Sequence, residues 1–236
     1  MFFASIRPNQ KTMKDPTVAI YGDLNAVAIH GGISQVEFTF DCRPMNEIAY
    51  EQLKRAFDEP GSAGRRIISN PDYHRAAVLV PLVRSVNRFE LLFTRRTETV
   101  ETHKGQISFP GGVVDATDND IVHTALREAD EEIGIPGSCI EIIGLLDDMA
   151  TPTGFVVTPV VGFVSELPTL NLNADEVAEV FRVELEFFVH PSNGRTELRE
   201  FRGKSHEVWY YDCGEHVVWG ATAVIIRSLL KKLHKV

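Results

Sequence analysis

The sequence predicts an α/β protein whose main part is preceded by a small β-rich extension. Apolar runs at residues 76–82 and 155–164 have the length and composition of buried strands. Residues 118–133 and the segment that starts near residue 218 have apolar side chains at three- and four-residue spacing, which is typical of helices buried on one side. The 236 residues are 44% hydrophobic, which is ample for a folded core.

Overall charge and cysteine usage exclude several classes of protein. A net charge of −9 argues against a general nucleic-acid or anionic-membrane surface, because such surfaces need clustered Lys and Arg. No apolar run approaches the ~20 residues of a membrane span. Cys42, Cys139 and Cys213 form no CxxC pair, so neither a disulfide framework nor a zinc site is indicated. A reducing cytoplasm fits best; the basic, acid-poor first residues leave a transit peptide as the alternative.

Residues 1–70 are expected to form an extension made of a β-rich segment and a helix. Its strand-like runs lie at residues 17–21, 26–30 and 35–41, and an amphipathic helix follows at 45–57. A Gly/Pro-rich piece at 60–64 precedes the boundary, which we place between residues 70 and 71. Such a strand set buries little apolar surface alone, so we expect it to pack on the main domain or on a second subunit, giving a homodimer.

The main domain, residues 71–236, is expected to contain several further strands and a helix near residue 218. The strands are predicted at residues 76–82, 89–94, 140–145, 155–164 and 207–213. In the loop after residue 145, Asp147 and Asp148 are expected to be solvated, with an approach to a metal as the alternative. The helix is expected to include Val218 and Trp219 in its first turn.

The helix predicted within residues 118–133 carries the chemistry. Because a helix advances roughly 100° per residue, Glu128, Glu131 and Glu132 fall on one exposed face. Like charges one turn apart destabilise a helix, and the single Arg127, which can pair with Glu131, cannot neutralise three carboxylates. A divalent cation with oxygen ligands can, so the pattern predicts a metal-dependent active site.

The ends of this helix are also marked in the sequence. Asp118 or Asn119 is expected to cap the first turn, and Asp120 suits the positive end of the helix. Gly134 suits the left-handed C-terminal position, and Pro136 prevents continuation.

These residues resemble the Nudix box, in which Gly, five residues, Glu and seven residues precede Arg-Glu-apolar-x-Glu-Glu-x-Gly-apolar. The agreement is complete from Arg127 to Ile135. Counting from Gly112, however, Asp118 occupies the first Glu position, and eight residues separate it from Arg127. The resemblance implies a metal-dependent hydrolase with the Nudix α/β/α sandwich, a mixed sheet between helices, in which the box forms a loop, a helix and a loop.

Residues 91–112, LLFTRRTETVETHKGQISFPGG, resemble the more specific signature of the coenzyme A diphosphatase branch of this family. That signature joins Leu-Leu, Thr-Arg-Arg, His-x-Gly-Gln and Phe-Pro-Gly-Gly. Where relatives commonly have an Arg, this chain has Glu101, so the phosphate contacts or the substrate are expected to differ. The Trp219-Gly220 to helix pattern also resembles this branch, and the likeness runs from about Arg75 onward.

The resemblance and the charges together suggest roles for individual residues. We expect Mg²⁺ or Mn²⁺ to be bound by Glu128 and Glu132, with the carbonyl of Gly112 or its neighbour Gly111 completing the shell. The other assignments are a proton acceptor, Glu131 or Glu176; a residue that holds the carboxylates, Arg127; and substrate contacts from Arg95, Arg96 and Gln106.

The reaction implied is hydrolysis of coenzyme A or its derivatives to phosphopantetheine and adenosine 3′,5′-bisphosphate. Two alternatives are kept. One is a Nudix hydrolase of another nucleoside diphosphate compound, such as ADP-ribose or a dinucleotide. The other is a non-catalytic nucleotide-binding regulator, although the box residues of such proteins are usually altered.

Overall fold

The computed structural model describes residues 45–58, 64–86, 88–98, 105–201 and 203–233, all of which belong to one compact unit, Cys42–Val236. Its helices are α1 (Met45–Asp58), α2 (Ile121–Ile133), α3 (Leu185–Val189) and α4 (Ala221–Lys232), with short 3-10 turns η1 (Gly137–Cys139) and η2 (Pro191–Asn193). Its strands are β1 (His74–Arg84), β2 (Phe89–Arg96), β3 (Ile107–Ser108), β4 (Gly111–Val113), β5 (Glu141–Leu145), β6 (Met149–Ala150), β7 (Phe155–Val164), β8 (Val177–Glu184), β9 (Gly194–Phe201), β10 (Lys204–Cys213) and β11 (His216–Trp219).

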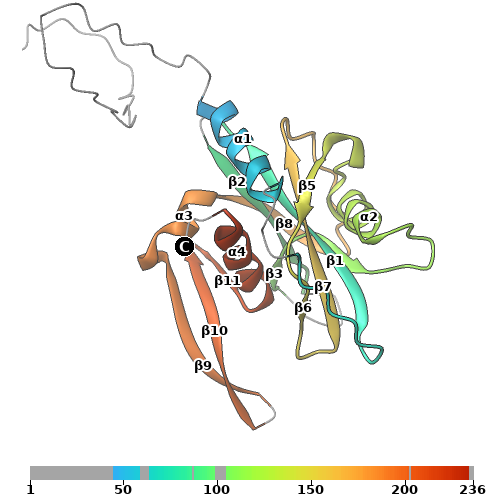
Figure 1. Cartoon of the computed structure of the whole chain (residues 1–236), viewed down its shortest axis with the longest axis vertical. Helices are drawn as coiled ribbons and strands as arrows, with labels where there is room; N and C mark the ends of the chain where they lie inside the picture. Colours follow the sequence, from blue (N-terminus) through green and yellow to red (C-terminus); the bar gives the residue numbers. More distant parts are fainter. Residues whose placement is uncertain (1–44, 59–63, 87, 99–104, 202, 234–236) are drawn as a thin grey trace, which may run out of the picture. The chain divides into compact units, whose positions relative to one another are not determined.

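The larger sheet has the strand order β3-β2-β1-β7-β5, and β4, β6 and β8 pair with β1, β7 and β2 respectively. Strands β1 and β7 are parallel along their whole length, whereas β1 is antiparallel to β2 and β4. The sheet is therefore mixed. Helices α2 and α4 lie on its two sides (Figure 1), so the predicted α/β/α arrangement is confirmed.

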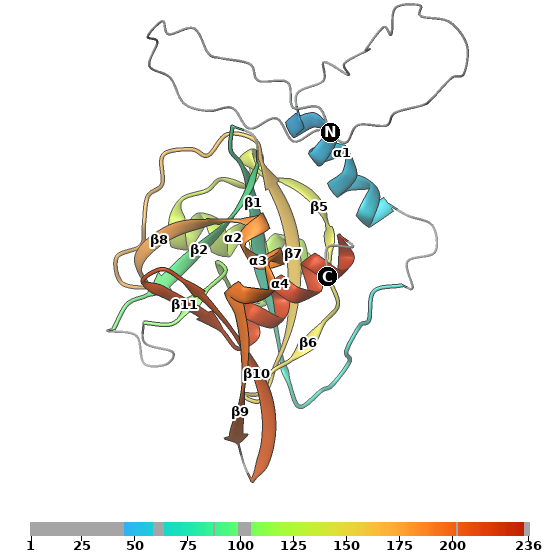
Figure 2. The same cartoon turned by 90° about the vertical axis from the view of Figure 1, so that its left-hand side faces the viewer.

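Each side of the sheet has its own apolar core. Ala125, Ala129 and Ile133 of α2 pack with residues of β1 and β7, and Ile226 and Leu230 of α4 pack in a separate cluster on the other side. A smaller sheet of β9, β10 and β11 packs against the cluster on the α4 side. Its β9–β10 hairpin projects beyond the larger sheet in Figure 2. The alternation of a strand's side chains therefore decides which side of the sheet each residue serves.

Several expectations about individual elements are confirmed and others are wrong. The strands predicted at 89–94, 140–145 and 155–164 correspond to β2, β5 and β7. Val218 and Trp219 belong to β11, and α4 begins only at Ala221, after Gly220. The strand runs predicted at 17–21, 26–30 and 35–41 lie outside the described residues, so they and the homodimer stay predictions, as does the boundary at 70/71.

Asp148 contradicts the expectation of a solvated loop. Its side chain is completely buried, and it accepts hydrogen bonds from the Thr158 hydroxyl at 2.6 Å and the Ile68 amide at 2.9 Å. The guanidinium of Arg65 also contacts it. Asp148 therefore fixes the segment that precedes β1 to the sheet, and it takes no part in the carboxylate cluster of α2.

Candidate active site

A glycine turn between β3 and β4 brings the backbone against β1 and α2. Gly111 has φ of 158°, and a Cβ there would lie 2.3 Å from the carbonyl oxygen of Ala77. A Cβ on Gly112 would lie 2.4 Å from a carboxylate oxygen of Glu128. Only glycine leaves room for this carboxylate beside the turn, which accounts for the Phe-Pro-Gly-Gly sequence.

Helix α2 begins and ends at local signals. The side chain of Asp120 accepts the His123 amide at 2.7 Å, so Asp120 is the N-cap, and the predicted cap at Asp118 or Asn119 is wrong. Gly134 ends the helix in the left-handed conformation with φ of 70°, as predicted.

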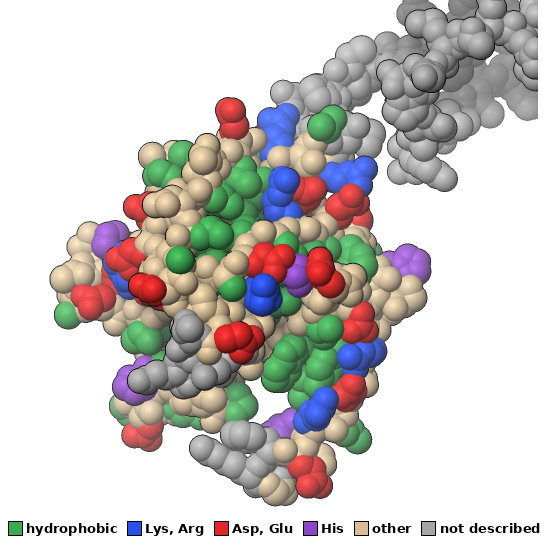
Figure 3. Space-filling model, turned by 180° about the vertical axis from the view of Figure 1, so that it is seen from behind, with side chains coloured by type: hydrophobic (Ala, Val, Ile, Leu, Met, Phe, Trp, Pro, Cys, Tyr) green, Lys and Arg blue, Asp and Glu red, His purple; other side chains and the backbone are tan. Residues whose placement is uncertain are grey.

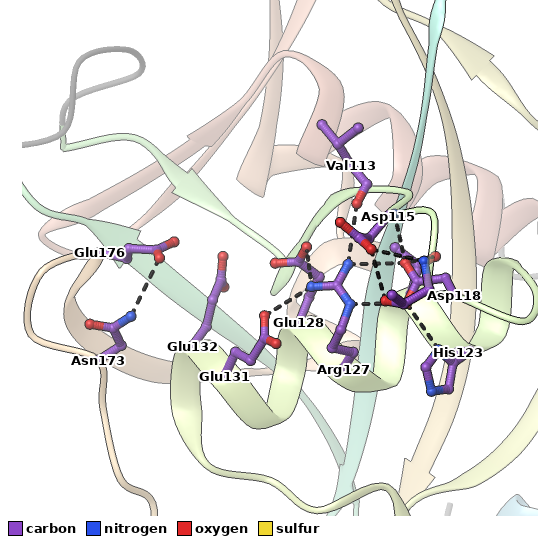
Figure 4. Close-up of polar contacts among 12 residues, drawn as sticks. Val113, Asp115, Asp118, His123, Arg127, Glu128, Glu131, Glu132, Asn173 and Glu176 are labelled. Carbon is purple, nitrogen blue, oxygen red and sulfur yellow. Dashed lines mark hydrogen bonds and ion pairs between the residues drawn. The ribbon is translucent and has the colours of Figure 1, made fainter.

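The guanidinium of Arg127 joins the box loop to the helix carboxylates (Figure 4). Its Nε and Nη2 donate to the two oxygens of Asp118 at 3.0 and 3.1 Å. Its Nη1 lies 2.9 Å from both Glu128 Oε1 and Glu131 Oε2. Arg127 therefore holds these two carboxylates in place, the geometry expected of its predicted role.

Asp118, the residue that departs from the box pattern, is completely buried. Besides Arg127 it accepts the Thr124 hydroxyl at 2.8 Å, and its other oxygen lies 2.9 Å from His123 Nδ1. The hydrogen bonds from Arg127 hold the pKa of Asp118 well below its usual range. A bidentate partner for Arg127 is thus present despite the shifted spacing; Thr124 and His123 were not anticipated, since neither belongs to the box pattern.

Glu128 and Glu132 point to the same side of α2, and both are shielded from water (Figure 4). Burial, and next the neighbouring Glu128 carboxylate, raise the pKa of Glu132 to about 8. Burial also raises the pKa of Glu128, although Arg127 opposes the rise. Glu131 differs from both, because 58% of its side chain is exposed.

Glu176 joins this group from a distant loop. The amide of Asn173 donates to the Glu132 carbonyl at 2.9 Å, and the Asn173 side chain donates to Glu176 Oε1 at 3.3 Å. The Glu176 carboxylate contributes to the raised pKa of both Glu128 and Glu132. Asn173 therefore positions Glu176 at the end of α2, a contact that the sequence does not reveal.

Arg95 and Arg96 face different partners. Arg96 Nη1 lies 4.0 Å from Glu132 Oε1, and its buried Nε has no hydrogen-bond partner among the described residues. Arg95 instead donates to Glu179 at 2.8 Å, and His216 of β11 contacts the other oxygen of Glu179 at 3.2 Å. Gln106 lies beside Arg96, because its carbonyl accepts the Arg96 amide at 3.0 Å. Arg96 therefore lies beside Glu132 of α2, whereas Arg95 lies beside Glu179.

The residues present fit a hard divalent cation. The described side chains include no cluster of three or more His, Cys, Asp or Glu with the geometry of a metal site. Glu128 and Glu132 supply two carboxylates, and Gly112 of β4 lies directly beside the Glu128 carboxylate. Burial raises the pKa of both glutamates in spite of Arg127 and Arg96, and a bound cation would favour their charged forms.

A mixed sheet flanked by helices carries a glycine-containing strand, β4, and a carboxylate-bearing helix, α2, and Arg127 ties the two together. The NUDIX domain model matches residues 72–209. The chain belongs to the Nudix family, whose members act on nucleoside diphosphate compounds and generally use divalent cations such as Mg²⁺ or Mn²⁺.

Similar proteins are known in bacteria. The chain is 42% identical over 158 residues to the uncharacterized Nudix hydrolase NudL of Escherichia coli O7:K1, covering 67% of this chain and 82% of the relative. It is 39% identical to the protein of the same name in Photorhabdus laumondii, covering 67% and 84%. Among solved structures, a Caenorhabditis elegans Ap4A hydrolase binary complex matches at 21% identity with a TM-score of 0.41, over 47% of this chain and 80% of that one.

The surface seen in Figure 3 carries Lys and Arg side chains interspersed with Asp and Glu, without a continuous basic area over the described residues shown. Within the described residues, no helix is both long and apolar enough to cross a membrane.

Proposed function

We propose that this chain hydrolyses the diphosphate bond of coenzyme A or its derivatives in the presence of Mg²⁺ or Mn²⁺, giving phosphopantetheine and adenosine 3′,5′-bisphosphate. The observation that carries the diphosphatase part is the pair of shielded carboxylates, Glu128 and Glu132, on one side of α2 with the Arg96 guanidinium beside Glu132. The choice of coenzyme A rests on the signature-like stretch at residues 91–112, which leads directly into the glycine turn.

Glu128, Glu132 and the Gly112 carbonyl would hold the cation. When bound, it supplies positive charge that offsets the repulsion between the diphosphate and an incoming nucleophile, and it promotes loss of a proton from water. Arg127 keeps Glu128 oriented through its bonds to Asp118. Arg96 is positioned to take a phosphate oxygen, because its guanidinium lies beside Glu132 and carries an unpaired Nε.

Hydrolysis forms one bond from the water oxygen to phosphorus and breaks the bridging P–O bond, and the water gives up a proton. Glu131 and Glu176 are the two candidate acceptors. Glu131 is exposed and held by Arg127, whereas Glu176 is held by Asn173 and lies near Glu132. Replacing each by Gln separates them, because loss of the base lowers kcat at every metal concentration.

Another nucleoside diphosphate compound, such as ADP-ribose or a dinucleotide, remains the second candidate substrate because of Glu101, which lies outside the described residues. A hydrolysis panel with Mg²⁺ or Mn²⁺ tests the proposal on coenzyme A, 3′-dephospho-coenzyme A, ADP-ribose and a dinucleotide. We expect coenzyme A to exceed its dephospho form by about tenfold in kcat/KM, the value of one charge-assisted phosphate contact. Equal cleavage of all four compounds would remove the coenzyme A assignment and leave the family assignment intact.

Two further parts of the proposal concern the state of the chain. We expect it to work in a reducing cytoplasm; among the described residues, Cys139 and Cys213 are free thiols. We also expect a homodimer to which residues 17–41 contribute. Light scattering on the full chain and on a chain that begins at Cys42 tests this, and a monomer in both preparations refutes it.

A further inference from the structure

The α4 side of the sheet has a hollow of about 490 Å³ that the proposed reaction does not use. Its lining includes Arg66 from the segment before β1, Asp147 from the loop after β5, and Arg227, Ser228 and Lys231 from α4. Helix α2 packs against the opposite side of the sheet (Figure 1). The hollow is therefore separate from the carboxylate cluster.

The charge in this hollow is positive, although the chain as a whole carries −9. Within the described residues, Arg66, Arg227 and Lys231 form no ion pair with an Asp or Glu. The only acidic side chain in the lining, Asp147, already accepts the Arg66 amide at 2.9 Å. Three cations around one partly satisfied carboxylate leave an excess of positive charge, which favours an anionic ligand.

Two of the three cations are held in place. Arg66 Nη2 donates to the carbonyl of Asp148 at 3.3 Å. The guanidinium of Arg227 lies 3.5 Å over the ring of Trp209. Burial raises the pKa of the Tyr211 hydroxyl, and a hydrogen bond from Arg227 offsets part of the rise. Stacking covers one flat face of a guanidinium and leaves its in-plane N–H groups for acceptors. Arg227 thus loses little conformational freedom when it binds an oxyanion.

The fold alone, without a ligand, explains the position of only some of the cations that line the hollow. Lys231 lies in the last turn of α4, where a cation is favourable because of the helix dipole. That argument also covers Lys232, which lies outside the hollow with its ammonium 5.5 Å from the Phe57 ring. It does not account for Arg66, which comes from a different segment, or for the stacked Arg227.

We propose that this hollow is a second binding site, for a phosphate-type oxyanion held by Arg66, Arg227, Lys231 and the Ser228 hydroxyl. The guanidinium, ammonium and hydroxyl groups of these four residues suit a phosphate group, and all four residues line one hollow; Arg227 also lines a second hollow, with Trp209 and Tyr211. Inorganic phosphate and the phosphate of a nucleotide share this chemistry, so the probes must separate the two sources.

The test uses the full chain with Trp219→Phe, which leaves Trp209 as the single tryptophan beside Arg227. Pyrophosphate, inorganic phosphate and AMP are titrated at constant ionic strength with EDTA, so that the metal-free carboxylates of α2 repel anions. We expect a saturable change in Trp209 fluorescence that chloride does not reproduce. Tighter binding of AMP than of inorganic phosphate would identify a nucleotide as the source, and the reverse would identify inorganic phosphate.

Variants separate a built site from general charge. Lys231→Gln and Arg66→Gln should each weaken the Kd by about tenfold, the value of one charge-assisted contact. The matched control Lys232→Gln, which removes an equal charge from the same helix end, should leave the Kd unchanged. Equal weakening in all three variants, or a response that chloride reproduces, overturns the proposal. Calorimetry with pyrophosphate decides the case in which Trp209 is silent, and no measurable binding there overturns it as well.

Discussion

Two buried aspartates, Asp118 and Asp148, share three kinds of hydrogen-bond donor and serve different parts of the molecule. Both side chains are completely buried, and each accepts hydrogen bonds from an arginine, a threonine hydroxyl and a backbone amide. The donors are Arg127, Thr124 and Asp115 for Asp118, and Arg65, Thr158 and Ile68 for Asp148.

The two networks differ in what each arginine contacts besides its aspartate. Arg127 continues from Asp118 to Glu128 and Glu131, so this network ends in the carboxylates of the proposed metal site. Among the described residues, Arg65 forms no ion pair with a second acid, so its network ends at the segment before β1. The same three kinds of donor therefore help to orient the proposed active site in one place and attach a chain segment in the other. Variants of the two regions should separate activity from stability.

The largest effect is expected at the end of the Asp118 network. Glu128→Gln and Glu132→Gln each remove a carboxylate that the proposed cation needs, so hydrolysis should fall by at least about 100-fold. The matched control is Asp130→Asn, which alters an exposed carboxylate on the same helix. Circular dichroism should show α2 intact in all three proteins. Near-normal turnover by either Glu variant would remove that residue from the site.

Asp118→Asn should have the next largest effect on activity. The variant weakens the bidentate partner of Arg127, and loss of such an outer partner lowers metal affinity or activity by about 10- to 100-fold. The metal concentration needed for half-maximal activity should rise, which a purely structural role would not cause. Asp148→Asn, with its activity expressed per folded molecule, should leave the metal requirement unchanged. An equal rise in both variants would contradict the different roles of the two aspartates.

A smaller effect separates the two adjacent arginines. Arg96→Ala should reduce the preference for coenzyme A over 3′-dephospho-coenzyme A from about tenfold toward unity, since Arg96 lies beside Glu132. Arg95→Ala should reduce it less, because Arg95 is paired with Glu179. Arg96→Lys, which keeps the charge, serves as the control. A larger change for Arg95→Ala would place the substrate on the β11 side of the sheet.

The features of this molecule that the sequence predicts correctly are those that depend on residues close together in the chain. The face of α2, its C-terminal glycine and the grouping of Glu128 with Glu132 follow from spacing within a few residues. The separate partners of Arg95 and Arg96 do not follow from spacing, because the register of β2 with β8 shifts between these two residues. The position of Glu176 depends on a hydrogen bond from the Asn173 amide to the Glu132 carbonyl at the end of α2, a contact between distant parts of the chain that no local pattern predicts.

The burial of Asp148 is invisible in the sequence for the same reason. Its partners Arg65 and Thr158 lie 83 and 10 residues away from it in the sequence. A short acidic stretch in a loop is usually solvated, and here only the tertiary structure supplies the donors that allow burial.

Asp148→Asn should change activity least and stability most. The variant removes a buried charge from its Arg65 and Thr158 partners and turns an NH₂ group toward donors, so it should cost about 3 kcal/mol in the free energy of unfolding. Urea denaturation at pH 7 measures this. The control Asp147→Asn, at an exposed neighbour, should stay within about 0.5 kcal/mol of the parent.

A chain that begins at Asn70 also lacks Arg65 and Ile68, so it should be less stable than one that begins at Cys42.

The stability that Asp148 contributes should depend on pH. Burial alone raises the pKa of Asp148, but the hydrogen bonds from Thr158, Ile68 and Arg65 outweigh burial and leave it below its ordinary value. A carboxyl whose pKa is lower in the folded state stabilises the protein above its unfolded pKa of about 3.9, and this contribution is lost as the pH falls through the folded pKa. The difference between parent and Asp148→Asn should therefore stay constant from pH 7 to about 5 and shrink below about pH 4. A difference that grows on acidification would mean that Asp148 is protonated in the folded protein, and the likeness to Asp118 would then be one of geometry without charge.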